Sequence, residues 1–227
     1  MSFSSFPEIP QPHWLQVHKQ ENRGPVLLVV LSVIALQFLI PKSLAIPHHK
    51  VFCFVEAVML ASIVLIAPKK LGLPHVPQRT LALILNAFMM LSNGASAILL
   101  VEKIVDGSIT SPTRLLWSGF SIWLSNIIIF SLWYWDFDRG GPSARATAKD
   151  SIPDFLFPQM TDPVYAEPGW YARYPDYLYV SVTNASAFSP TDAMPLTRWA
   201  KLLMSIQSIT SLILVGLVVA RAVNILR

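Results

Sequence analysis

The residue of this sequence with the clearest capacity for chemistry is Glu56, a carboxylic acid in the middle of the apolar run 51–67. A carboxyl group in such a run is costly in lipid, so it usually faces the interior of a helical bundle. Two interpretations stay open: Glu56 is a protonated or hydrogen-bonded group that holds helices together, or it lies on an ion or proton pathway. The partners that other apolar runs offer it are Asn86, Asn93, Asn126 and Arg221.

A second group of polar side chains lies within and just after the short, mildly apolar segment from Pro175 to Pro190. It consists of Thr183, Asn184, Ser186, Ser189, Thr191 and Asp192. A half-length helix, a polar turn and a full-length helix are the parts of a pore loop, so these residues are candidates for the lining of a polar cavity or ion pathway. Arg198 and Lys201 begin the last apolar run and Arg221 lies near its end. These three are candidates for helix pairing, or for contacts with lipid phosphates at the membrane interface.

Other kinds of chemistry have no support in the sequence. Cys53 is the only cysteine, and His48 and His49 have no third ligand at a characteristic spacing, so no metal site is expected. The motifs of nucleotide-binding loops, zinc proteases and serine hydrolases do not occur. No cluster of Lys and Arg indicates nucleic-acid binding. We therefore expect neither an enzyme nor a bound cofactor.

The composition places these residues in a membrane. Hydrophobic residues make up 53% of the chain and charged residues 13%, against about 25% charged residues in soluble domains. Apolar runs at 26–40, 51–67, 80–101 and 115–135 approach the ~20 residues that cross a bilayer. Three prolines in 68–79 predict a loop there. Phe155, Leu156 and Phe157, in the next long loop, are expected to lie on the membrane interface.

The sequence thus predicts an all-α, polytopic membrane protein with five full transmembrane helices and one short or re-entrant helix. Its parts are a polar tail (1–25), a four-span region (26–135), a loop rich in Pro and Gly outside the membrane (136–175) and a pore-like hairpin (176–227). If the four spans alternate, the side of the N-terminus holds nine Lys and Arg residues against four on the other side, which favours a cytoplasmic N-terminus. The nine are Lys19, Arg23, Lys69, Lys70, Arg79, Arg139, Arg145, Lys149 and Arg173; the four are Lys42, Lys50, Lys103 and Arg114.

The same count does not decide whether the segment from Pro175 to Pro190 crosses the membrane or returns to the side from which it enters. With all charges assigned, either path puts 11 Lys and Arg residues inside and 6 outside. Crossing gives six spans, and re-entry gives five with an outside C-terminus.

Two resemblances lie in the C-terminal third. The stretch YVSVTNASAFSPTDAMPLTRWAKLLMSIQSITSLILVGLVVARAVNIL resembles the pore helix, filter and inner helix of two-span cation channels. The stretches DRGGP, DFLFPQ, PDYLYVSVTNASAFSPTD and VNIL resemble an uncharacterised family of bacterial integral membrane proteins. That family implies a bacterial inner membrane and brings no established activity. A potassium filter needs glycines for its stacked carbonyls, and none occurs between Trp170 and Val215.

Two functions are consistent with this sequence. The first is small-ion transport by a channel-like or permease-like protein, which would form a homo-oligomer if the hairpin lines a pore. The alternative is a structural or accessory membrane protein whose hairpin only packs. In both cases the lipid bilayer is the main partner.

Overall fold

The computed structural model describes residues 12–19, 21, 23–66, 76–148, 152–186 and 193–226. These described residues are 76% helical, with almost no strand among them. In chain order the elements are η1 (His13–Leu15), α1 (Gly24–Leu39), α2 (His49–Ile66), α3 (Val76–Val105), α4 (Pro112–Phe137), η2 (Asp138–Gly140), α5 (Pro142–Ala146), β1 (Phe155–Leu156), α6 (Pro158–Thr161), η3 (Pro163–Tyr165), α7 (Tyr174–Ser186), β2 (Met194–Pro195) and α8 (Arg198–Leu226).

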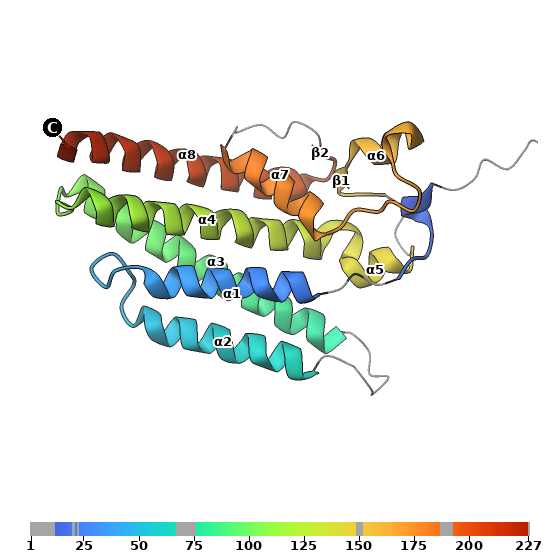
Figure 1. Ribbon diagram of the computed structural model, residues 1–227, viewed down its shortest axis with the longest axis horizontal. Coiled ribbons are helices and arrows are strands. Elements are labelled where there is room, and N and C mark those ends of the chain that lie inside the picture. The colour runs from blue at the N-terminus through green and yellow to red at the C-terminus, as the bar shows by residue number, and fades with distance from the viewer. Residues whose placement is uncertain are drawn as a thin grey trace, which may run out of the picture.

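Helix α4 lies at the centre of an elongated bundle. It packs against α1 and α3 on one side and against α7 and α8 on the other, while α2 packs against α1 and α3 (Figure 1). Helices α1 to α4 alternate in direction, so α1 begins and α4 ends at the same end of the bundle, on the right of Figure 1. Figure 1 also shows that α3 crosses the bundle obliquely.

Prolines set several of the helix boundaries. Pro25 and Pro112 lie in the first turns of α1 and α4, where the missing N–H costs no hydrogen bond. Ser111 caps α4, because its hydroxyl accepts a hydrogen bond from the Arg114 N–H at 3.5 Å. The prediction of a loop throughout 68–79 is wrong at its end, since α3 begins at Val76. Pro77 is the second residue of that helix, a position that proline tolerates.

Within the described part of the chain, three helices are long and apolar enough to cross a membrane: Gln78–Val105, Pro112–Gly140 and Arg198–Ile225. The prediction of an all-α chain is confirmed, and these three helices are consistent with the predicted membrane protein. The finer prediction of five full spans is not confirmed. Helix α1, for example, has only 16 residues, or ~24 Å of helix.

Helices α7 and α8 begin at the same end of the bundle. Tyr174, the first residue of α7, packs edge-on against Trp135 near the end of α4, with 6.0 Å between ring centroids. Trp199, in the first turn of α8, lies 5.3 Å from the ring of Phe137, the last residue of α4. The 13 residues of α7 therefore run partway along the bundle, and the chain returns before α8 starts. Residues 187–192 are not among the described residues, so the predicted cavity residues Ser189, Thr191 and Asp192 lie outside them.

A compact cap covers this end of the bundle, and we call it the cap end. The cap consists of the described residues of 12–23 and 138–173, together with β2. Asp138 holds it together, because its carboxylate accepts hydrogen bonds from the Asp154 N–H at 2.8 Å and the Tyr177 hydroxyl at 2.5 Å. Glu21 ties the N-terminal segment to two helices: its carboxylate accepts from the Trp135 indole and the Tyr174 N–H, each at 2.8 Å.

Aromatic side chains fill the space between the cap and the helices. Phe155 packs against Tyr134, Tyr177 and Trp199, with ring centroids 5.0 to 6.3 Å apart. Phe155 and Phe157 are buried within the protein, so the expectation that they lie on the membrane interface is wrong. The antiparallel pair of β1 with β2 fixes this segment beside the start of α8.

Candidate functional site

Glu56 lies in the interior of the four-helix unit formed by α1 to α4. Its side chain has no exposed surface. The groups that face it are the amide of Gln37 from α1 and, beyond that amide, the hydroxyl of Ser92 from α3. A single terminal atom of the Gln37 amide faces Glu56; it is Oε1 in one orientation of the amide and Nε2 in the other. This atom lies 3.1 and 3.2 Å from the two carboxyl oxygens and 3.2 Å from Ser92 Oγ. Three helices thus meet at one carboxyl group through neutral polar partners.

Two orientations of the Gln37 amide fit the same position, and each would suit one protonation state of Glu56. In the first orientation, Gln37 Nε2 donates to the Met89 carbonyl at 3.5 Å and Oε1 faces the carboxyl group. Since Oε1 only accepts hydrogen bonds, Glu56 must then be protonated to donate to it. In the other, Nε2 donates to both carboxyl oxygens, which suits the ionised form. A carboxyl group beside a primary amide can therefore gain or lose a proton without losing its hydrogen-bonding partner.

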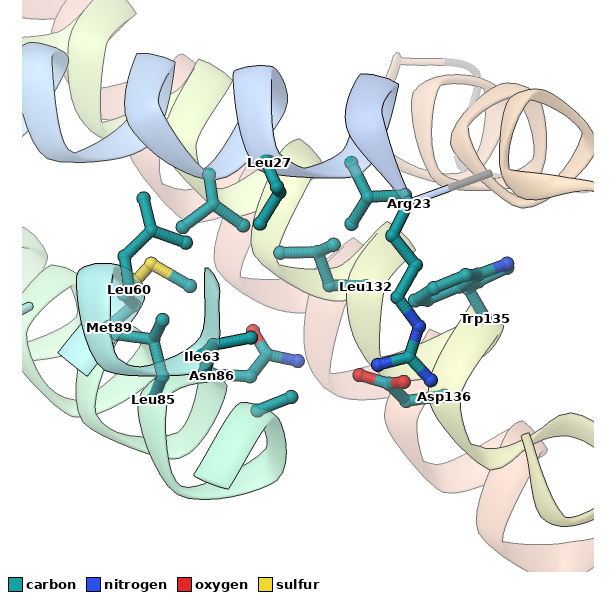
Figure 2. Close-up of a pocket in the computed structure, with 13 residues that line it drawn as sticks. Arg23, Leu27, Leu60, Ile63, Leu85, Asn86, Met89, Leu132, Trp135 and Asp136 are labelled. Carbon is teal, nitrogen blue, oxygen red and sulfur yellow. The ribbon is translucent and has the colours of Figure 1, made fainter. Parts of the chain in front are cut away.

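A pocket of about 50 Å³ lies in the same four-helix unit, nearer the cap end (Figure 2). We call it the Asn86 pocket. Asn86 is 2% exposed, and neither its amide oxygen nor its amide nitrogen has a hydrogen-bonding partner among the described residues. Every helix of the unit contributes to the lining, which consists of Arg23, Val26, Leu27 and Val30 from α1 and its start, Leu60 and Ile63 from α2, Ala82, Leu85, Asn86 and Met89 from α3, and Leu132, Trp135 and Asp136 from α4.

Arg23 and Asp136 face each other at the end of the pocket away from Leu60 and Met89 (Figure 2). Burial lowers the pKa of the Arg23 guanidinium, and attraction to the Asp136 carboxylate opposes this shift. Arg79 approaches from α3, where its Nη2 donates to the Asp136 carbonyl at 3.4 Å. The pocket is therefore charged at one end, amide-lined in the middle and apolar at the other end.

Polar residues continue along the inner faces of α3 and α4. On α4, Ser118, Ser121 and Ser125 have no exposed surface. They are three and four residues apart, so they share one face of the helix. Leu132 and Asp136, which line the pocket, lie further along the same face. On α3, Ser92 and Ser96 are also buried and lie four residues apart. We call these two serine sets the inner stripe. The hydroxyls of Ser118, Ser121 and Ser125 have no hydrogen-bonding partner among the described residues.

Asn93 and Asn126, two further predicted members of a polar cavity, lie away from Glu56. Both line a groove of about 190 Å³ between α3, α4 and α8. Asn93 Nδ2 donates to the Ile122 carbonyl at 3.2 Å, and Asn126 Nδ2 donates to Ser211 Oγ at 3.3 Å. These two asparagines connect helices, and the structure does not bring them to the carboxyl group.

The polar groups of the α7 and α8 hairpin bond mainly to one another and to α4. Gln207 is the centre: its Oε1 accepts from the Tyr134 hydroxyl at 2.6 Å and from Asn184 Nδ2 at 2.8 Å. Its Nε2 donates to the carbonyl and the hydroxyl of Ser181, at 3.1 and 2.6 Å. The Ser181 hydroxyl donates in turn to the Ile127 carbonyl at 2.6 Å. Tyr134, Ser181 and Gln207 have no exposed surface, so this network is a buried joint between α4, α7 and α8.

The other predicted hairpin residues have separate surroundings. Thr183 and Ser186 each donate to carbonyls of the preceding turn of α7. Arg198 and Lys201 are exposed at the start of α8. Arg221 Nη2 donates to the carbonyls of Gly107 and Ile109, at 2.8 and 2.9 Å, so it ties α8 to the α3–α4 loop. Arg221 is thus no partner of Glu56.

Sequence reasoning did not predict the roles of Gln37, Ser92 and Gln207. The signal that could have found two of them is simple: Gln37 is the strongly polar residue of the first apolar run, and Gln207 lies deep in the last one. A glutamine in such a position requires a partner on another helix, because lipid offers none.

Comparison of the chain with protein-family models, with curated proteins and with solved structures found no match. Its resemblance to bacterial membrane proteins and to two-span channels stays a prediction. Among the described residues, no group of three His, Cys, Asp or Glu side chains forms a candidate metal site.

Proposed function

We propose that this protein transports a small ion across a membrane through the interior of α1 to α4, with Glu56 as the residue that binds the ion. The ion that the site fits best is the proton. The observation that carries the proposal is the pairing of a fully buried carboxyl group with the Gln37 amide, whose oxygen or nitrogen can face it. A carboxyl group inside a membrane helix is a functional site by default, and this one has a partner for each protonation state.

The proposed cycle needs only a proton and a rotation of one amide. When Glu56 holds the proton, its hydroxyl donates to Gln37 Oε1, Gln37 Nε2 donates to the Met89 carbonyl and the Ser92 hydroxyl donates to Oε1. When the proton leaves, the amide turns over and Nε2 donates to the carboxylate oxygens and to Ser92 Oγ. The inner stripe and the Asn86 pocket supply polar groups on either side of Glu56 along the unit.

The proposal assigns the hairpin a structural role. A pore loop must offer polar atoms to ions, whereas Asn184, Ser181 and Gln207 use theirs on one another and on α4. We therefore propose that α7 is a short re-entrant helix that braces α4 and α8. The ion pathway would lie on the opposite side of α4, between α1 and α3.

The arrangement of the helices also suggests which of them cross the membrane. We propose five crossings, by α1, α2, α3, α4 and α8, in a multi-pass protein of a bacterial inner membrane. Because α7 and α8 begin at the cap end, the N-terminal segment, the cap, Arg198 and Lys201 all lie on one side of the membrane. That side holds 11 of the Lys and Arg residues against 6 on the other, and the excess of positive charge favours the cytoplasm.

A second function, that of an accessory membrane protein, is favoured by one observation. The hairpin is joined to α4 by a buried network in which Tyr134, Ser181, Asn184 and Gln207 are all hydrogen-bonded, as in an element that only packs. Glu56 and Gln37 would then form a joint of the same kind between α1 and α2.

Proton flux in proteoliposomes tests the proposal. Purified protein is reconstituted with a pH-sensitive dye inside, and an imposed membrane potential drives protons across. We expect Glu56→Gln to abolish the flux, because an amide cannot exchange the proton. Glu102→Gln is the matched control, since Glu102 is exposed at the end of α3, and it should retain the flux of the native protein.

The outcomes separate the two functions. Flux that persists in Glu56→Gln at the native rate excludes Glu56 as the binding residue. If the native protein carries neither protons nor sodium or potassium ions, and Glu56→Gln instead lowers the unfolding temperature, the accessory function replaces transport. Size-exclusion chromatography in detergent shows whether each variant is folded before the flux is measured.

A further inference from the structure

We infer that the Asn86 pocket is a water-filled vestibule entered from the cap end, and that Leu60 and Met89 form an apolar gate between this water and Glu56. The gate rests on the proposed function. The water-filled vestibule does not, since hydration of the pocket is independent of transport.

The amide of Asn86 is the reason to assign water to the pocket. A buried polar group without a hydrogen-bonding partner destabilises the folded protein. Asn86 is 2% exposed, and neither end of its amide is paired within the described residues. Water offers both a donor and an acceptor, so it satisfies both ends.

The size and lining of the pocket suit a few water molecules. The pocket has about 50 Å³, and one water needs roughly 10–15 Å³ by the same kind of measure. A water in a protein interior also needs two to four polar partners. Asn86, Arg23 and Asp136 provide them along one side of the pocket (Figure 2). The apolar remainder of the lining leaves no site for a larger polar ligand.

The charged end gives this water a route to the aqueous phase. Arg23 precedes α1 and is half-buried, and Asp136 lies in the last turn of α4 beside the cap. Their facing charges hold water at the mouth more strongly than an apolar rim would. The inferred entrance of the vestibule is this charged end beneath the cap, where Arg23 keeps part of its surface exposed.

Two side chains close the opposite end. Leu60 lies one helical turn beyond Glu56 on α2, and Met89 lies three residues before Ser92 on α3. Both line the pocket, and they are 5% and 1% exposed. This layer is about one turn thick, and methionine changes rotamer readily. A motion of the Met89 side chain would let water reach Glu56, so the gate controls access of the proton.

Hydroxyl-radical footprinting of the protein in lipid nanodiscs tests the hydration. Radicals formed from bound water oxidise the side chains that the water touches, and the Met89 thioether is a sensitive reporter. We expect Met89 to be oxidised in the native protein, and several-fold less in Asn86→Leu, which removes the polar anchor. Asn93→Leu is the matched control, because Asn93 lies on the same helix and outside the pocket.

The gate is tested by proton flux in Met89→Ser, which we expect to exceed the native flux several-fold and to require Glu56. Met90→Ser, in the groove of Asn93, should leave the flux unchanged. If Met89 is protected in the native protein, or equally oxidised in Asn86→Leu, the vestibule is refuted even where Glu56→Gln abolishes transport. If Met89 reports water but no variant changes flux, the vestibule stands and the proposed function fails. Unchanged or lower flux in Met89→Ser alone refutes the gate.

Discussion

Replacement of Gln207 by leucine should destabilise the protein more than any other polar-to-apolar change within α8. Gln207 is fully buried and makes four hydrogen bonds, two as acceptor and two as donor. Side-chain hydrogen bonds inside membrane proteins contribute about 0.6 kcal/mol each on average, so four contribute about 2.4 kcal/mol. Leucine also leaves the Tyr134 hydroxyl without its acceptor, which adds roughly 1 kcal/mol or more.

The free energy of unfolding can be measured by titration of mixed micelles with a denaturing detergent, with tryptophan fluorescence as the signal. We expect a loss of about 3 kcal/mol in Gln207→Leu. Tyr134→Phe alone should cost about 0.6 kcal/mol, because Asn184 still donates to Gln207 Oε1. In Gln207→Leu, the further change Tyr134→Phe should be neutral or stabilising, since it removes the unpaired hydroxyl.

Ser205→Ala provides the matched control. Its hydroxyl donates to the Lys201 carbonyl of its own helix and is exposed, so the change should stay within about 0.5 kcal/mol. The reasoning is refuted if Gln207→Leu is no more destabilising than Ser205→Ala. It is also refuted if the effects of Tyr134→Phe and Gln207→Leu are additive, because the cycle would then detect no coupling.

Two glycine substitutions test the backbone and the helix packing by the same measurement. Gly141 has φ +91° and a Cβ there would lie 2.7 Å from the Asp136 carbonyl oxygen, so Gly141→Ala should cost about 3 kcal/mol; Gly169→Ala, at φ +79° in open space, should cost only about 1 kcal/mol, and equal costs would contradict the proposed clash. A Cβ at Gly119 would lie 2.8 Å from Val218 Cγ2, so Gly119→Ala should cost about 1–3 kcal/mol, and Val218→Ala should recover part of that loss. Failure of this rescue would mean that α4 and α8 do not meet at Gly119.

The sequence was sufficient to predict that Glu56 faces the interior of the bundle, but not to choose its partners. Asn86 and Asn93 are seven residues apart, so they share one face of α3. They nevertheless have different neighbours, because α3 crosses the bundle obliquely (Figure 1). Asn86 lies in the interior of α1 to α4, whereas Asn93 lies in the groove with α8. Helical periodicity gives the face of a residue, while the crossing angle decides which helix that face meets.

The sequence also did not predict whether the segment that contains α7 crosses the membrane or returns. The charge count is the same for a crossing and a returning segment, and the segment has an intermediate length. Contacts far apart in the chain decide where α7 begins, such as that of Tyr174 with Trp135. The burial of Phe155 has the same origin, because Tyr134, Tyr177 and Trp199 come from three separate helices.

The position of Glu21 has a consequence for the order of events during synthesis. Its carboxylate receives the Tyr174 N–H across 153 residues of chain, so this contact cannot form until most of the polypeptide has left the ribosome. Helices α1 to α4 can associate earlier, because their contacts need nothing beyond Phe137. Attachment of the N-terminal segment is thus a late step of maturation, and a nascent chain that stops before Tyr174 would present Glu21 and the Trp135 indole as an unfinished surface to quality-control factors.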